Sequence, residues 1–207
     1  MDKIVITIAR QYGSGGRTVG KMLAERLGIN YYNSDLVKKA SEISGINEAL
    51  FVKADEYTNE SFLKRLKRDN KDETILGPDS PDYTSEANLF KFQAKAIREL
   101  ADTESCVIIG RAADYVLRDY DNVLSVFVHA PQEFLLAQAG KKLSLKGKDL
   151  EKHIAKIDKG HAEYYKLHTG REWTDARNYD LCLDSSKLGY ERCVEEIIAY
   201  MDVRFKK

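Results

Sequence analysis

Short apolar runs alternate with longer amphipathic segments along most of this chain. The apolar runs, rich in valine and isoleucine, occupy residues 3–9, 29–33, 105–109, 123–129 and 180–184. Most of them are continuous rather than alternating, as in parallel strands that are buried on both faces of a sheet. Apolar stripes at helical spacing lie between them, and the first comprises Val19, Met22, Leu23 and Leu27. The pattern therefore predicts an α/β fold, with a parallel sheet of about five strands and helices on both faces.

Two stretches interrupt this alternation. Residues 35–85 have a helical pattern without a good strand, and they end in a turn-rich run from Gly77 to Asp82. Residues from about 140 to 178 are polar and carry several cations, namely Lys141, Lys142, Lys146, Lys148, Lys152, Arg171 and Arg177. We predict a single domain over 1–207, in which 35–85 is a helical insertion that covers a substrate and 140–178 is a mobile lid. The alternative for the second stretch is a pair of solvated helices.

Charge and composition exclude several classes of partner. The 207 residues carry 33 basic and 33 acidic side chains, so no overall field favours nucleic acid or an acidic membrane. The first apolar run meets Arg10 without a secretion signal, and no segment approaches the roughly 20 apolar residues of a membrane-spanning helix. The cysteines Cys106, Cys182 and Cys193 lack paired spacing and are expected to be buried thiols. We therefore expect a cytoplasmic protein that binds neither nucleic acid nor membrane.

A glycine-rich turn follows the first apolar run and leads into the first amphipathic stripe. It reads Gly13-Ser14-Gly15-Gly16-Arg17-Thr18. Glycines let backbone N–H groups converge on a phosphate, and a helix N-terminus adds partial positive charge. In one register of the Walker pattern, Gln11 replaces the first glycine, Arg17 replaces the lysine, and Thr18 supplies the hydroxyl that ligates Mg²⁺. In the other, Gly13 and Gly15 are the inner glycines and Gly16 takes the position of the lysine.

Two other interpretations of this turn remain open. One is a tight connection between strand and helix, which glycines also serve. The other is a dinucleotide-binding loop, in which Gly13 and Gly15 match but Thr18 stands where a third glycine belongs. Asp35 would then bind a ribose. With a phosphate loop, Asp35 would instead hold Mg²⁺ or an acceptor substrate, or it would cap the following helix together with Ser34.

A second cation stands at the end of another predicted strand. Gly110-Arg111 follows the apolar run 105–109, where the ligands of open parallel sheets bind. Arg111 is thus a candidate phosphate contact, and a salt bridge at a helix start is the alternative. The histidines show no zinc-binding spacing, and they are His129, His153, His161 and His168.

Together these segments resemble the cytidylate kinase-like family of P-loop nucleoside and nucleotide kinases. The similarity lies in residues 6–17, in 108–111, at Trp173 and in 178–189, and it spans nearly the whole chain. The resemblance implies a three-layer P-loop kinase fold with an acceptor-binding insertion after the second strand and a lid late in the chain. The two interruptions described above lie at those places.

The resemblance also implies roles for single residues. Residues 13–18 would form the ATP phosphate loop. Arg111 would correspond to the cation of the family's Gly-Arg-Asp motif near the acceptor phosphate, with Ala112 in place of the aspartate. Asp158 lies in the helix that follows the lid, where the family clusters aspartate and arginine, and His161 stands where an arginine is expected.

The resulting hypothesis is ATP-dependent phosphoryl transfer, with Mg²⁺, to a nucleoside monophosphate (cytidylate-like) or a similar small acceptor. Arg17 and Arg111 would neutralise the charges of donor and acceptor, and Asp35 is the third candidate catalytic residue. The alternative is a nucleotide-binding sensor that keeps the kinase fold without the transfer chemistry. The missing Walker lysine and the scarcity of lid arginines motivate that alternative.

Overall fold

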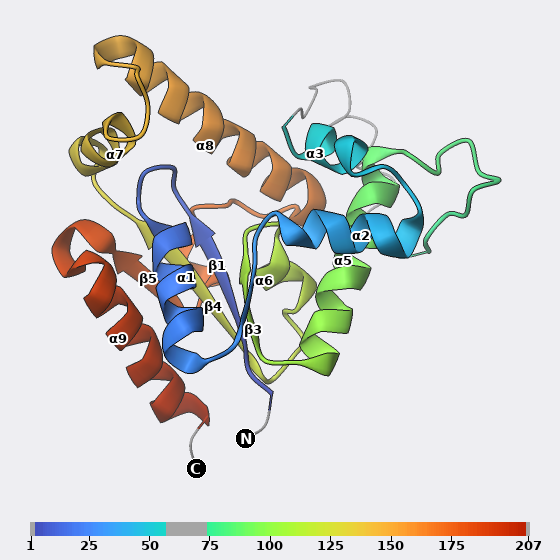
Figure 1. Cartoon of the computed structure of the whole chain (residues 1–207), viewed down its shortest axis with the longest axis horizontal. Coiled ribbons are helices and arrows are strands. Elements are labelled where there is room, and N and C mark those ends of the chain that lie inside the picture. The colour runs from blue at the N-terminus through green and yellow to red at the C-terminus, as the bar shows by residue number, and fades with distance from the viewer. Residues whose placement is uncertain (1–2, 57–73, 206–207) are drawn as a thin grey trace.

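The fold centres on one parallel sheet of five strands (Figure 1). The structure is a computed structural model, and it describes residues 3–56 and 74–205. The strands are β1 (Val5–Arg10), β2 (Asn30–Tyr32), β3 (Cys106–Ile109), β4 (Val123–His129) and β5 (Leu181–Asp184). Their spatial order is β2-β3-β1-β4-β5, and every neighbouring pair is parallel. The predicted sheet is confirmed, and the run 123–129 matches its strand at both ends.

The strand order excludes the dinucleotide-binding interpretation of the glycine turn. In a dinucleotide-binding sheet the second strand lies directly beside the first. Here β3 lies between them, with Val5 of β1 opposite Cys106 and Tyr31 of β2 opposite Val107. The carboxyl ends of β1 and β3 are therefore neighbours, which brings the glycine turn and Gly110-Arg111 to the same edge of the sheet.

Helices follow the strands and cover both faces of the sheet (Figure 1). They are α1 (Gly16–Leu27), α2 (Asp35–Ser44), α3 (Glu48–Glu56), α5 (Glu86–Thr103), α6 (Ala113–Val116), α7 (Gln132–Gly140), α8 (Gly147–Thr169), the 3₁₀ helix η1 (Ala176–Asn178) and α9 (Ser185–Phe205). Helix α9 is kinked at Gly189, whose φ of 73° is not helical.

The two faces of the sheet carry different layers of helices. Ile6 and Ile8 of β1 point toward α1 and α9 and are fully buried against Leu23 and Ile197. Val5, which directly precedes Ile6, lies on the opposite face, in a core built with α2, α3, α5 and α6. The strands are continuously apolar because their side chains are buried on both faces of the sheet. Each Å² of apolar surface removed from water stabilises the fold by about 25 cal/mol.

The two interruptions contain helices, as their sequence pattern predicts. Helices α2 and α3 lie within 35–85, residues 57–73 of that stretch lie outside the described residues, and 74–85 contain turns only. The second stretch is dominated by α8, a single helix of 23 residues. The substrate-covering and lid roles of these segments remain predictions.

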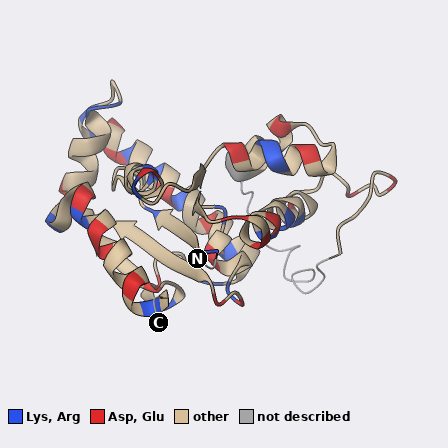
Figure 2. Cartoon of the chain, turned by 60° about the horizontal axis from the view of Figure 1, so that its bottom comes forward, with Lys and Arg blue, Asp and Glu red and all other residues tan. Residues whose placement is uncertain are grey.

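Charges of both signs are interspersed over the helices, as Figure 2 shows, in keeping with the formal net charge of zero. Among the residues that the structure describes, no helix is both long and apolar enough to cross a membrane. Cys106 and Cys193 are buried free thiols, as predicted, but Cys182 is exposed. The prediction for Cys182 was wrong because its side chain points to the opposite face of β5 from its neighbour Leu183, which is buried in the core with α9.

Candidate active site

The glycine turn forms an open loop whose backbone is suited to an anion. Gly13 and Gly15 have φ angles of 87° and 83°, in the left-handed region that favours glycine. Gly15 is the N-cap of α1 and receives no side-chain cap, and the first helical bond runs from the Val19 N–H to the Gly15 carbonyl. The amides of Gly16, Arg17 and Thr18 precede that bond and are therefore directed at the space beyond the helix end.

Close packing explains why the loop needs so many glycines. A Cβ atom on Gly13 would lie 2.6 Å from the Leu135 carbonyl oxygen, and one on Gly15 would overlap the Tyr190 ring. Gly20, one turn into α1, lies so close to the sheet that a Cβ would be 2.7 Å from Cδ1 of Ile109. The tight-turn interpretation explains none of these contacts, since a simple turn needs only the backbone angles.

Hydrogen bonds to two segments that are distant in sequence fix the loop. Gln11, at the position of the first Walker glycine, accepts a hydrogen bond from the Ala130 N–H through its side-chain oxygen at 3.2 Å. The Ser14 hydroxyl donates to the Gln11 carbonyl at 2.8 Å. Ser185, fully buried at the start of α9, donates to the Ser14 carbonyl at 2.7 Å. The loop is thus held in place before any ligand binds.

A cleft of about 480 Å³ opens above the loop, within the size range of small-molecule sites. Its walls come from the loop, from the end of β1, from α7 and the turn after it, from α8 and from α9. The lining residues are Arg10, Gln11, Tyr12, Gly13, Gly15, Gly16, Arg17, Thr18, Gln138, Ala139, Lys142, Ile157, His161 and Tyr190. Of the predicted loop residues, only Ser14 is absent from the lining, because it is fully buried beneath the loop.

Arg10, which lines the cleft, is a candidate site residue that the sequence interpretation missed. Its side chain runs from the loop toward the end of β3: a Cβ on Gly16 would overlap its Cβ, and one on Gly110 would lie 2.5 Å from its Nη1. Burial, together with the positive charges of Arg17 and Arg111, lowers the pKa of Arg10 to about 10. A buried cation beside two other cations indicates a site for an anion.

Arg111 projects from a turn of unusual handedness. Gly110, Arg111 and Ala112 have φ angles of 69°, 61° and 51°, and the Ala113 N–H donates to the Gly110 carbonyl at 3.1 Å. Left-handed conformations of residues other than glycine cost about 1–3 kcal/mol each and are concentrated at functional sites. Burial lowers the pKa of Arg111, and the charge of Arg17 contributes in the same direction. Arg111 is thus close enough to Arg17 for their charges to interact, although only Arg17 lines the cleft. Their roles toward donor and acceptor stay predictions.

Asp35 does not share this cleft. It is exposed, in the first turn of α2 beyond the end of β2, and Ser34 makes no side-chain cap there. Burial raises the pKa of Tyr31, and the Asp35 carboxylate contributes in the same direction. The Tyr31 hydroxyl donates to the Arg17 carbonyl at 3.4 Å. The proposed roles of Asp35 toward a metal or an acceptor stay predictions.

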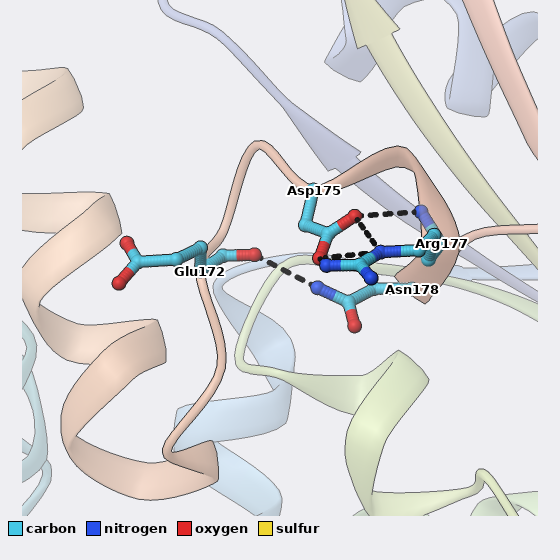
Figure 3. A network of polar contacts seen from close by, with 4 residues as sticks. All are labelled: Glu172, Asp175, Arg177 and Asn178. Carbon is cyan, nitrogen blue, oxygen red and sulfur yellow. Dashed lines mark hydrogen bonds and ion pairs between the residues drawn. The ribbon is translucent and has the colours of Figure 1, made fainter.

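The cations of the predicted lid have different surroundings. Lys142 lines the cleft, whereas Lys141 donates to Gln138 at 3.2 Å. Arg177 is held by Asp175 at 2.7 Å, and in Figure 3 these two lie beside Asn178, which donates to the Glu172 carbonyl. This local network fixes the segment between α8 and β5.

The strand order and the glycine loop beneath a cationic cleft define a P-loop kinase fold. The chain belongs to the Cytidylate kinase-like family, whose sequence model matches residues 5–187. It is 24% identical over 208 residues to a cytidylate kinase of Methanopyrus kandleri, with 96% of this chain and 93% of that protein covered.

Solved structures share the fold. An uncharacterized protein from Eubacterium ventriosum has a TM-score of 0.71 at 24% identity, over 98% of this chain and all of that one. The shikimate kinase of Acinetobacter baumannii, solved with shikimate, has a TM-score of 0.52 at 13% identity, over 100% of this chain and 97% of that one. At these identities the similarity supports the P-loop kinase architecture and leaves the substrate undetermined.

Proposed function

We propose that this protein is an ATP-dependent kinase that transfers a phosphoryl group to a nucleoside monophosphate, cytidylate or a close analogue. The observation that carries the proposal is the convergence of Arg10, Arg17 and Arg111 at the glycine loop, from β1, α1 and the turn after β3. In phosphoryl transfer the protein contributes mainly positioned cations and oriented dipoles, and this cluster supplies both.

The loop fits the phosphates of ATP, because its amides point outward from the helix start and its glycines let its backbone pack closely against Leu135 and Tyr190. Residues 13–18 would hold the β and γ phosphates, with Arg17 in place of the Walker lysine. Thr18, which lines the cleft, would offer its hydroxyl to Mg²⁺. The ion would neutralise charge on the phosphates when bound. Arg111 would bind the acceptor phosphate as a bidentate cation.

The choice of a cytidylate-like acceptor rests on the family and on the Methanopyrus kandleri relative named cytidylate kinase. Its base would lie toward α2 and α3, in the helical insertion 35–85 that is expected to bind it. The free thiols of Cys106 and Cys193 fit a reducing, cytoplasmic compartment.

The test incubates the protein with Mg-ATP and a panel of nucleoside monophosphates and other phosphorylatable metabolites, with products identified by phosphorus NMR. We expect one phosphorylated product, and we expect Arg17→Ala to lower turnover by about a hundredfold or more. Lys21→Ala is the matched control, because Lys21 lies on the same helix and pairs with Glu25 at its exposed surface. Unchanged turnover in Arg17→Ala would remove Arg17 from the mechanism.

The absence of a Walker lysine in the loop favours a second candidate, a nucleotide-binding sensor with the same fold. Arg17, in its place, is exposed and presents a planar fork instead of a compact ammonium. Nucleotide binding without transfer to any member of the panel would support the sensor and refute the kinase.

A further inference from the structure

Helix α8 crosses above the phosphate loop and contacts it through one carboxylate (Figure 1). Oδ1 of Asp158 accepts a hydrogen bond from the Tyr12 N–H at 2.8 Å. The same oxygen lies 3.4 Å from Nδ1 of His161, one turn further along the helix. One residue thus orients both the backbone of the loop and an imidazole ring.

The His161 ring forms part of the cleft wall. Its Nδ1 is buried on the Asp158 side, and the ring leans against Trp173, with centroids 5.3 Å apart and planes at 50°. With Nδ1 turned to the carboxylate, Nε2 is the nitrogen left to meet a ligand in the cleft. The charged groups that share its surroundings come from α8, β1, α1 and the turn after α7, and they are Asp158, Arg10, Arg17 and Lys142.

These surroundings disfavour the charged form of the imidazole. Burial lowers the pKa of His161 below its usual value of 6.5, and the positive charges of Arg10 and Arg17 act in the same direction. The negative charge of Asp158, 3.4 Å from Nδ1, opposes them. A bound phosphate would reverse this balance, because several negative charges beside the ring favour the protonated form.

We propose that His161 binds the terminal phosphate of the donor nucleotide as an imidazolium ion, so that nucleotide binding takes up a proton at this side chain. The inference rests on the proposed function, since it assumes that the cleft holds the donor phosphates. Asp158 is the positioning residue, which fixes the ring and favours its charged form. An arginine at this position would be charged at every pH, whereas a histidine makes the site sensitive to pH near neutrality.

The decisive measurement is the number of protons taken up when Mg-ATP binds, obtained by calorimetry in buffers of different ionisation enthalpy. At about pH 7 we expect the wild-type protein to take up close to one proton more than His161→Gln. The affinity of the wild type should fall by up to about tenfold per pH unit above neutrality. His161→Arg should keep the affinity without the proton uptake. Lys159→Gln is the control on the same helix and should behave like the wild type, because Lys159 pairs with Glu163 at an exposed position.

The outcomes separate this inference from the proposed function. Equal proton uptake by the wild type and His161→Gln would overturn the role of His161, even if the protein is an active kinase. Proton uptake that depends on His161, without transfer to any acceptor, would refute the kinase activity and support the phosphate contact. No binding of Mg-ATP at all would overturn both. The His161→Arg variant guards against misfolding of His161→Gln, because it should bind Mg-ATP at high pH more tightly than the wild type.

Discussion

The hydroxyl of Ser185 donates a hydrogen bond to the main-chain carbonyl of Ser14 at 2.7 Å, and it lies 3.3 Å from the carbonyl oxygen of His129. This fully buried side chain joins the phosphate loop to the ends of β4 and β5. The bond thus links the loop to the segment 178–189, which is far from it in sequence and also carries part of the family resemblance.

Replacing Ser185 by alanine should weaken nucleotide binding and stability together. The buried Ser14 carbonyl would lose its partner, at a cost of about 1–3 kcal/mol in the free energy of unfolding. Denaturant unfolding and Mg-ATP titration measure the two effects. Ser186→Ala is the matched control, because the Ser186 hydroxyl bonds to Asp184 and not to the loop. Similar losses of nucleotide affinity in both variants would contradict the role of the Ser185–Ser14 hydrogen bond in holding the loop.

Gly15→Ala should abolish nucleotide binding while Gly28→Ala should not. Both glycines have positive φ, 83° and 65°, so alanine costs about 1–2 kcal/mol of strain at either position. At Gly15 the added methyl group also overlaps the Tyr190 ring, whereas at Gly28 it meets open space. Thermal unfolding measures the loss of stability in each variant, and nucleotide titration measures the loss of affinity. Equal losses in Gly15→Ala and Gly28→Ala would show that the overlap with Tyr190 is unimportant.

Arg10→Met should lower turnover without lowering stability. The substitution keeps an unbranched stem between Gly16 and Gly110 but removes a buried charge that Arg17 and Arg111 repel. We expect a loss in turnover of about a hundredfold and an unchanged or higher melting temperature. A lower melting temperature with normal turnover would assign Arg10 a structural role instead.

Asp114→Asn should stabilise the protein at alkaline pH and have little effect in acid. Burial raises the pKa of Asp114 to about 6, although its side chain accepts a hydrogen bond from Tyr165 at 2.6 Å. A raised carboxyl pKa means that the folded state binds the proton more tightly than the unfolded state, so stability falls as pH rises from about 4 to about 6. Asparagine keeps an acceptor for Tyr165 and should gain about 1–3 kcal/mol at pH ~8.

Urea unfolding of Asp114→Asn at about pH 4 and pH 8 gives the two differences. Asp119→Asn, at an exposed site paired with Arg118 at 3.4 Å, is the control for loss of a surface charge. An equal gain at both pH values would disprove the buried-carboxylate explanation.

His168 affects the pH dependence of stability in the opposite direction, because it destabilises the folded protein in acid. Its ring is stacked on Phe90 with centroids 4.0 Å apart, and burial lowers its pKa to about 3. Because the unfolded chain binds the proton more tightly, stability is lost as pH falls from about 6.5 toward 3, by up to about 1.4 kcal/mol per unit. His168→Phe should keep the stack and show a shallower acid dependence in unfolding experiments. An unchanged slope would show that other groups govern acid unfolding.

The sheet could be predicted from the sequence because its strands are buried on both faces and are therefore continuously apolar, as in Val5 to Ala9. The glycine loop could be predicted because each glycine meets a steric demand. Arg10 could not, since an arginine at the end of an apolar run resembles a simple strand terminus. Its role depends on Gly110, which becomes its neighbour only when β3 pairs with β1. The sequence did contain one signal, namely that Gly16 and Gly110 follow two of the predicted strands. Glycines at those places leave room for a long side chain such as that of Arg10 to pass between them.

The left-handed turn from Gly110 to Ala112 restricts which sequences can evolve there. Its handedness disfavours β-branched residues at Arg111 and Ala112 whatever their chemistry, and glycine at 111 would relieve the strain but remove the cation. Aspartate tolerates this backbone region better than alanine does. The Gly-Arg-Asp motif that the resemblance implies would therefore fit the turn better than the Gly-Arg-Ala of this chain. A substitution of Ala112 by aspartate would be limited by the aromatic side chains around it, not by the main chain.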